Sequence, residues 1–272
     1  MKRKLSWGLL GAIAALLNPM TASATSLSPH FYALGRTYSN VPIHGTYFVS
    51  QNTGEDLSNN NPTSGQIITK ETWLNFSYGN GNEWIETGTL YGNIYRSFSD
   101  KTLDTAWRGS FVATNGCAGA SGSTCSSYTT TFREGEVGAN LTGTHNFIIR
   151  KKTDGSGDYQ VYIDYNPTTV INGSSFTVSD PISADMGIES SDTGNSWTSG
   201  TIGYDWWIVD PSNETNPGTA GWYPVNPNIA ITQITSNNYN GASVNFQYPY
   251  NNGTTVPAGA VTQSNRFLFN HN

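Results

Sequence analysis

Short runs of β-branched and aromatic residues alternate with clusters of Gly, Asn, Asp and Ser along almost the whole chain of 272 residues. No apolar period of 3.6 residues, the spacing that an amphipathic helix requires, is sustained anywhere. Charged residues make up only 12% of the chain, about half of the usual share, so the Lys- and Glu-rich surfaces of exposed helices are missing. The pattern predicts strands joined by turns and disfavours helical folds.

The plainest local element is a β-hairpin. Its first arm is expected over residues 145–150, its turn over 151–157 and its second arm over 158–165. Because side chains alternate along a strand, four residues of the second arm are expected on one face: Tyr159, Val161, Ile163 and Tyr165.

Further strands are expected in the same way. They cover residues 45–49, 67–76, 84–91, 106–114, 127–132, 175–178, 185–189 and 204–209, and then 229–235, 242–248 and 266–269. Roughly a dozen strands with turns between them predict an all-β fold of two stacked antiparallel sheets. We expect a jelly-roll or concanavalin-like sandwich in preference to a smaller Greek-key barrel.

The first 24 residues have the order of an export signal. Three basic residues at positions 2–4 precede an apolar stretch over 5–17, and Ala22-Ser23-Ala24 has the form of a cleavage site. No later segment reaches the roughly 18 apolar residues that a spanning helix needs. The mature protein is therefore expected to be secreted or periplasmic, away from the membrane, and monomeric.

The composition changes after Asp210, where Pro and Gly become frequent. We expect a β-sandwich domain over 25–210 and a linker or lid over 211–228. Residues 229–272 are expected to add edge strands or to form a small appendage.

Charge and cysteine content restrict the partners and the compartment. Cleavage after Ala24 would leave 10 basic and 19 acidic residues, and such a surface repels phosphate, so nucleic acid is not an expected partner. Cys117 and Cys125 enclose seven small residues and are expected to form a disulfide in an oxidising compartment.

Several kinds of catalytic site lack their signature. The four histidines do not form a His-Glu-x-x-His pair, so neither a metal site nor a cofactor is expected. The stretch from Asp154 to Asp158 has spacing that calcium could use, but a polar hairpin turn explains it better.

Two glutamates have a shared local design. Glu86 lies two residues before Gly88, and Glu189 lies two residues after Gly187. In both segments the neighbouring apolar residues are expected to point inward, which would place the carboxylate on an open sheet face with a clear approach. Either glutamate alone is more simply a solvated side chain, but two acids of different pKa are what carboxyl-only catalysis requires.

At these residues the chain resembles the glutamic peptidases of the neprosin family and, more distantly, of the eqolisin family. The segment Ile85-Glu86-Thr87-Gly88 is similar to the Ile-Glu-Ala-Gly context of the first neprosin glutamate, and Gly187-Ile188-Glu189 is the nearest match to Gly-Gly-Glu at the second. The two acids are 103 residues apart, and the short cystine loop and the hairpin fall between them in the expected order. The likeness extends over residues 67–209.

The resemblance implies an endopeptidase that acts at acid pH on polypeptides, with Glu86 and Glu189 as catalytic residues. One glutamate would take a proton from the attacking water, and the other would hydrogen-bond the oxyanion and assist departure of the amine. Trp84 and Tyr162 are candidate substrate-binding residues, with plain packing as the alternative for both.

Two other classes of function remain open. A retaining glycoside hydrolase could use the same two glutamates on a polysaccharide, although no aromatic residue follows Glu86. A non-catalytic carbohydrate-binding sandwich would use the abundant Trp and Tyr and would need no paired acids.

Overall fold

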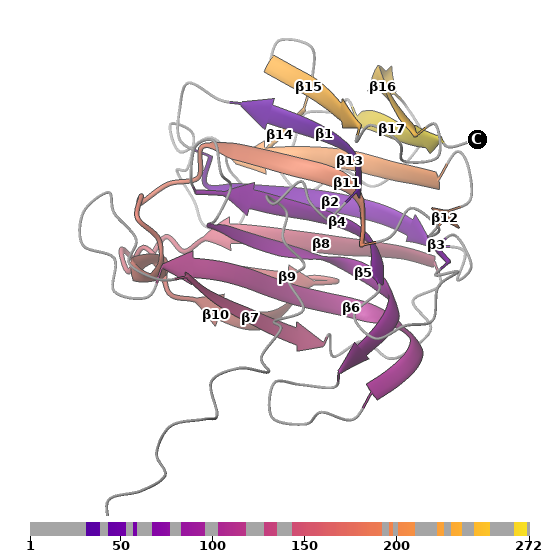
Figure 1. Ribbon diagram of the computed structural model, residues 1–272. Helices are drawn as coiled ribbons and strands as arrows, with labels where there is room; N and C mark the ends of the chain where they lie inside the picture. Colours follow the sequence, from indigo (N-terminus) through magenta and orange to yellow (C-terminus); the bar gives the residue numbers. More distant parts are fainter. Residues whose placement is uncertain are drawn as a thin grey trace, which may run out of the picture.

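The computed structural model describes residues 31–38, 43–52, 57–58, 67–76, 83–95, 103–117, 128–134, 143–191, 196–197, 201–209, 222–225, 230–235, 242–250 and 264–270. Within these ranges the strands form two large antiparallel sheets that stack face to face (Figure 1). The predicted all-β fold with two antiparallel sheets is therefore confirmed. Among the described residues, no helix has the length and apolar character needed to cross a membrane.

The first sheet, sheet A, has seven strands among the described residues. Their spatial order is β15 (Ala230–Thr235), β1 (Phe31–Tyr38), β11 (Ser183–Ser190), β4 (Ile67–Asn75), β5 (Trp84–Tyr95), β6 (Leu103–Cys117) and β7 (Tyr128–Glu134).

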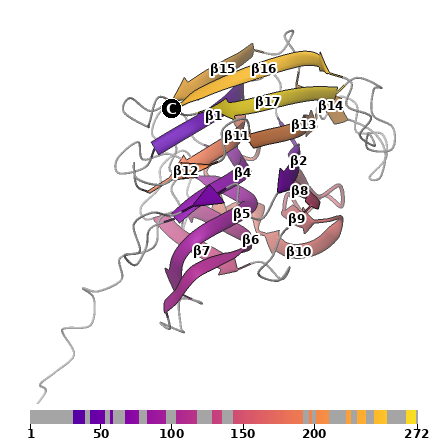
Figure 2. The same ribbon diagram turned by 90° about the vertical axis from the view of Figure 1, so that its right-hand side faces the viewer.

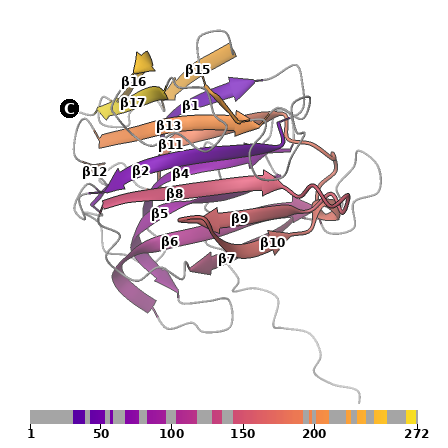
Figure 3. The same ribbon diagram turned by 180° about the vertical axis from the view of Figure 1, so that it is seen from behind.

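The second sheet, sheet B, has eight described strands and is seen from its outer side in Figure 3. Its main order is β10 (Asn166–Ile171), β9 (Tyr159–Ile163), β8 (Gly143–Lys151), β2 (Gly45–Asn52), β13 (Thr201–Val209), β17 (Ser264–Asn270) and β16 (Ser243–Tyr250). β14 (Trp222–Pro224) pairs with β13, and a separate two-stranded ribbon joins β3 (Leu57–Ser58) to β12 (Ser196–Trp197).

The core lies between the two sheets. Strict alternation places every second side chain of β4 and β11 on the inner face, where Ile68, Leu74 and Ile188 pack with Phe48 and Phe147 of sheet B. The apolar area removed from water there, at about 25 cal/mol per Å², is the main favourable contribution to folding.

A buried chain of hydrogen bonds also joins the sheets. The indole Nε1 of Trp206 lies 2.9 Å from Thr46 Oγ1, which is 2.7 Å from Thr72 Oγ1, and the Thr72 hydroxyl donates to the carbonyl oxygen of Asp185 at 2.8 Å. An indole N–H only donates and a carbonyl only accepts, so the proton of Thr46 must point to Thr72. The chain is fully paired, and a fully paired buried network stabilises one relative placement of the sheets.

Asn265 secures an irregularity in β13. The register of β13 against β2 shifts between Tyr204 and Trp206. The buried amide of Asn265 accepts a hydrogen bond from Trp206 N and donates to the carbonyl oxygens of Trp206 and Val225. These bonds satisfy backbone groups that the bulge takes out of the sheet ladder.

The predicted hairpin is confirmed as β8 and β9, with one difference at its end. Tyr159, Val161 and Ile163 are buried in the core as expected, but Tyr165 is 58% exposed. Asp164 and Tyr165 have φ values of 51° and 64°. They form the turn into β10, so the alternation that the sequence suggested stops at Ile163.

Other differences from the expected strands have local causes. Residues 175–178 are not a strand: Gly173–Ser175 form a 3₁₀ turn whose N-cap is Asn172, and Phe176 stacks on Phe76 in the core. β1 was not predicted because Gly35 and Arg36 interrupt its pattern. β10 was hidden by Pro167, which this strand accommodates because it lies at the edge of sheet B.

The strands after residue 229 belong to the sandwich. β15 pairs with β1 at the edge of sheet A, while β16 and β17 extend sheet B. Figure 2 shows these three strands together at one end of the molecule. Of the expected linker or lid, the structure describes only residues 222–225, and the expected export signal lies outside the described residues.

Candidate active site

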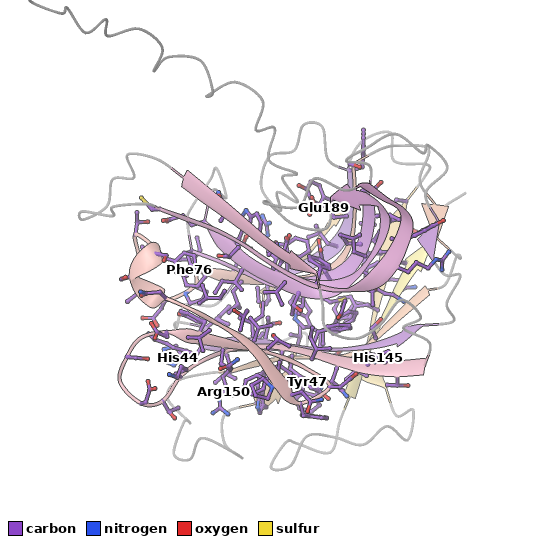
Figure 4. The ribbon with its side chains drawn as sticks, turned by 90° about the horizontal axis from the view of Figure 1, so that it is seen from below. His44, Tyr47, Phe76, His145, Arg150 and Glu189 are labelled. Carbon is purple, nitrogen blue, oxygen red and sulfur yellow. The ribbon has the colours of Figure 1, made fainter. Side chains whose placement is uncertain are left out.

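Glu86 and Glu189 lie on the same face of sheet A, the one turned away from sheet B. We call it the glutamate face; it also carries Glu71 of β4 and an apolar cluster. The cluster consists of Tyr32, Leu34, Ile67, Trp73, Trp84, Leu90, Phe111 and Ala113. Figure 4 shows Glu189 on the concave side of the curved sheet.

The strand register places Glu71 between two glycines. Glu71 is opposite Gly187 of β11 on one side and opposite Gly88 of β5 on the other. Glu189 lies two residues after Gly187, and Glu86 lies two residues before Gly88. The two other glutamates are therefore diagonal neighbours of Glu71, within reach of a long side chain.

Glycine is required at both of these positions. A Cβ built on Gly88 would lie 2.2 Å from the carbonyl oxygen of Lys70 and 2.7 Å from the Cβ of Glu71. A Cβ built on Gly187 would lie 2.3 Å from the carbonyl oxygen of Ala33. Gly88 thus lets β5 approach β4 closely at Glu71, and Gly187 lets β11 approach β1 closely at Leu34.

The three glutamates form one cluster. One carboxylate oxygen from each of Glu71, Glu86 and Glu189 lies within 4.8 Å of the others. Their side chains are 0%, 0% and 1% exposed, respectively. The expectation of solvated carboxylates with a clear approach is therefore wrong: both faces of β4 and β11 are buried.

Burial favours the protonated form of Glu71 and Glu86. Among the residues that the structure describes, neither oxygen of Glu86 has a hydrogen-bond partner. Burial, with the charges of Glu71 and Glu189, raises the pKa of Glu86 well above its ordinary value of 4.5. Burial and the charge of Glu189 likewise raise the pKa of Glu71.

The same environment acts on Tyr32, which is opposite Glu189 in the register. Burial, followed by the charges of Glu189 and Glu71, raises the pKa of Tyr32 far above its ordinary value of 10.0. Its phenol is protonated under all working conditions, so it is a hydrogen-bond donor beside the cluster.

The nearby acid Asp185 differs because it has cationic and amide partners. The guanidinium of Arg36 donates two hydrogen bonds from Nε and one of 2.6 Å from Nη2, and Asn75 Nδ2 donates another at 3.0 Å. Burial still raises the pKa of Asp185 against these bonds. Asp185 is therefore anchored as an ion-paired residue of this face.

The candidate substrate-binding residues separate in the structure. Trp84 lies on the glutamate face two residues from Glu86, and it is 1% exposed. Tyr162 is on the outer face of sheet B, packed against the cluster of Tyr47, Val49, Ile148, Trp207, Val209 and Trp222. Figure 4 shows Tyr47 on that far side, so Tyr162 does not belong to the glutamate site.

The remaining predicted features are partly described. Cys117 is buried and disulfide-bonded; Cys125, the only other cysteine of the chain, lies outside the described residues. Asp154 bonds to Lys152 and to the backbone of Ser156, while Asp158 accepts from Gly173 N. These two carboxylates serve separate partners, as a polar turn requires.

Glu71 was missed because its segment reads as an ordinary strand with the charged pair Lys70-Glu71. Only the alternation that places Glu71 on the face of Trp73 was available as a signal. The cluster offers three carboxylate oxygens, the ligand type that Mg²⁺, Ca²⁺ and Mn²⁺ prefer. Its chemistry without a metal is general acid and base catalysis by coupled carboxyls.

Neither the models of known protein families nor the curated proteins give a match to this sequence. Sheep galectin-11 in complex with glycerol is a similar solved structure, at 12% identity and a TM-score of 0.31, with 61% of this chain and 92% of that chain covered. The GlcNAcα1-4Gal-releasing endo-β-galactosidase of Clostridium perfringens has 10% identity and a TM-score of 0.33, covering 71% and 47%. The CBM40 of a Ruminococcus gnavus sialidase bound to α2,3-sialyllactose has 8% identity and a TM-score of 0.29, covering 57% and 74%. At these scores the likeness is limited to the sandwich architecture.

Proposed function

We propose that the glutamate cluster is the active centre of a peptidase that hydrolyses polypeptides by carboxyl acid and base catalysis. The observation that carries the proposal is the convergence of three buried carboxyls within 4.8 Å, where burial raises the pKa of Glu71 and Glu86. Such groups keep protons at pH values where free carboxyls have lost them. The resemblance of the segments around Glu86 and Glu189 to neprosin motifs supports a peptide substrate.

The proposed mechanism assigns separate roles within the cluster. Glu189 takes a proton from a water molecule as the water oxygen attacks the peptide carbonyl carbon. Glu86, which retains its proton, donates a hydrogen bond to the developing oxyanion and then transfers that proton to the leaving amide nitrogen as the C–N bond breaks. The proton on Glu189 returns to Glu86 through the coupled carboxyls, which restores the starting state.

Glu71 and Tyr32 support these two residues in the proposal. Glu71 lies between them and keeps the number of protons in the cluster high, while the phenol of Tyr32 is opposite Glu189. The oxygens of Glu71 and Glu86 are out of contact with solvent, so a substrate reaches them only when the covering residues move. Turnover should therefore depend on opening of the glutamate face.

A retaining glycoside hydrolase is the second candidate, because its two carboxyls are about 5 to 5.5 Å apart, and one oxygen of Glu86 lies within 4.8 Å of one oxygen of Glu189. An inverting enzyme is less compatible, since it needs about 6.5 to 9.5 Å. The nucleophile of a retaining enzyme must be ionised. Burial raises the pKa of Glu86 and so disfavours this residue as the ionised nucleophile of a retaining enzyme.

The test is hydrolysis of a denatured, fluorescently quenched protein by the chain lacking residues 1–24, measured from pH 2 to pH 8. We expect cleavage that peaks at acid pH and falls at least about a hundredfold in each of Glu86→Gln and Glu189→Gln. Asp158→Asn is the matched acid-to-amide control; its carboxylate serves a turn of sheet B, and activity should be unchanged.

Two outcomes would overturn the proposal. Cleavage that persists in both glutamine variants would mean that another site is responsible. Absence of cleavage in a folded protein, together with glutamate-dependent release of sugar from a polysaccharide panel, would establish the glycosidase.

A further inference from the structure

A pocket of about 180 Å³ opens beside the β8–β9 hairpin, on sheet B. It is lined by Arg150, Lys151, Lys152, Thr153, Asp154, Gln160 and Tyr162. Figure 4 shows Arg150 on the side of the molecule away from Glu189, so the pocket and the glutamate site are separate. We call it the hairpin pocket.

The hairpin pocket concentrates positive charge on an acidic protein. The chain has 13 Lys and Arg against 19 Asp and Glu, yet three consecutive basic residues and a single acid line this pocket. Lys151 is held by Asp180 at 2.6 Å, and Lys152 pairs with Asp154 at 2.6 Å near the surface. The lining residues still include more basic than acidic side chains, and this excess of positive charge attracts anions to the pocket.

The donors of the pocket stand on a rigid base. Arg150 is directly opposite Gln160, and Ile148 is opposite Tyr162, so these side chains share the outer face of two paired strands. The Arg150 guanidinium lies 6.0 Å from the ring of Trp222, within cation–π range. Gln160 is fixed by hydrogen bonds from Nε2 to the carbonyl oxygens of Val161 and Thr169.

Tyr162 adds a different kind of surface to the pocket. Its ring packs against the apolar cluster that contains Tyr47 and Trp222, and the residue also lines the pocket. A guanidinium and an ammonium beside an anchored aromatic ring match an oxyanion attached to a small organic group.

We propose that the hairpin pocket binds the carboxylate or sulfate group of an acidic ligand, with Arg150 and Lys152 as charged donors and Tyr162 as the flanking ring. Asp154 competes with the ligand for Lys152 and so sets the affinity. This site is independent of hydrolysis at the glutamate cluster.

The test uses the chain lacking residues 1–24 labelled with ¹⁵N and titrated at constant ionic strength with sodium sulfate, sodium glucuronate or sodium N-acetylglycinate, against sodium chloride. Saturable shifts should be confined to amides of residues 150–162. The three probes separate a free inorganic anion, a saccharide-borne carboxylate and a peptide-like carboxylate as the preferred source.

Two substitutions should change affinity in opposite directions. Lys152→Gln should raise Kd about threefold or more, and Asp154→Asn should lower it by a similar factor, because exposed charge pairs contribute modestly. Arg108→Gln removes a cation that stacks on Tyr91 in sheet A and should leave Kd unchanged. Absence of saturable shifts, or weaker anion binding in Asp154→Asn, would overturn the proposal. A titration with CaCl₂ tests the opposite charge: saturable shifts that disappear in Asp154→Asn would mean that the turn binds a cation instead.

Discussion

Glu86→Gln should be more stable than the wild type, and this difference in the free energy of unfolding should grow as the pH rises. The amide has nearly the shape of a protonated carboxyl and cannot ionise. In the wild type, Glu86 is fully buried, its oxygens have no hydrogen-bond partner in the described part of the chain, and its pKa is raised well above 4.5. The variant therefore removes the pH-dependent contribution that ionisation of this carboxyl makes to the free energy of unfolding.

The sign follows from proton linkage. Above its ordinary pKa of 4.5 the carboxyl loses its proton in the unfolded chain but keeps it in the folded protein. The folded state then binds more protons, so the free energy of unfolding falls as pH rises until the folded pKa is passed. One retained proton corresponds to about 1.4 kcal/mol per pH unit. The group's contribution is complete below pH 4.5 and is lost above it.

The expected magnitude can be stated as a difference between proteins. Between pH 4.5 and pH 6.5 the free energy of unfolding of Glu86→Gln should rise relative to the wild type by up to about 3 kcal/mol. Glu71→Gln should show the same direction, because burial also raises the pKa of Glu71. The double variant should gain less than the sum, since the two carboxyls interact.

Urea denaturation followed by tryptophan fluorescence at pH 4.5, 5.5 and 6.5 measures this difference. Asp154→Asn is the control: the pKa of this exposed acid is lowered by the Lys152 ammonium, so it is ionised in both states across the range and the slope should equal that of the wild type. Parallel stability curves for the wild type and Glu86→Gln would refute the reasoning, because they would mean that Glu86 titrates normally in the fold.

Three further substitutions test the close approach of two strands and two sets of buried hydrogen bonds. Gly88→Ala places a methyl group 2.2 Å from the backbone oxygen of Lys70 and should lower the free energy of unfolding by about 3 kcal/mol or more, as measured by urea denaturation. Asn265→Ala removes the acceptor of Trp206 N, while the Trp206 carbonyl oxygen keeps the bond from Val225 N; it should cost about 2 to 3 kcal/mol, with faster amide exchange confined to the bulge. Thr72→Val breaks the hydroxyl bridge between the sheets and should cost about 1 to 2 kcal/mol in thermal unfolding, whereas an unchanged Tm would show that the bridge is dispensable.

Much of the architecture could be read from local pattern. A two-residue alternation is a property of neighbouring residues, so most strands, the β8–β9 hairpin and the orientation of Glu86 and Glu189 away from the core were predicted. The pattern failed where local chemistry departs from alternation, as at Gly35 in β1, Pro167 in β10 and the capped turn before Phe176.

The candidate site needed information of another kind. Which residues face one another across strands depends on register, and strands far apart in sequence set the register through the packing of whole faces. Glu71 joins Glu86 and Glu189 only because β4 lies between β11 and β5. Tyr162 and Trp84 are both aromatic residues within predicted strands. Tyr162, however, belongs to sheet B and lies on the opposite side of the molecule from Trp84.

Alternation therefore specified the direction of each glutamate relative to its own strand. It left open what covers that face, and a carboxylate in water and one in a buried cluster have the same sequence. Strand order and sheet curvature brought three acids out of solvent and within 4.8 Å of one another. The raised pKa values of Glu71 and Glu86 arise from desolvation and from repulsion by neighbouring carboxylates, which are properties of the folded arrangement and not of the residues along the chain.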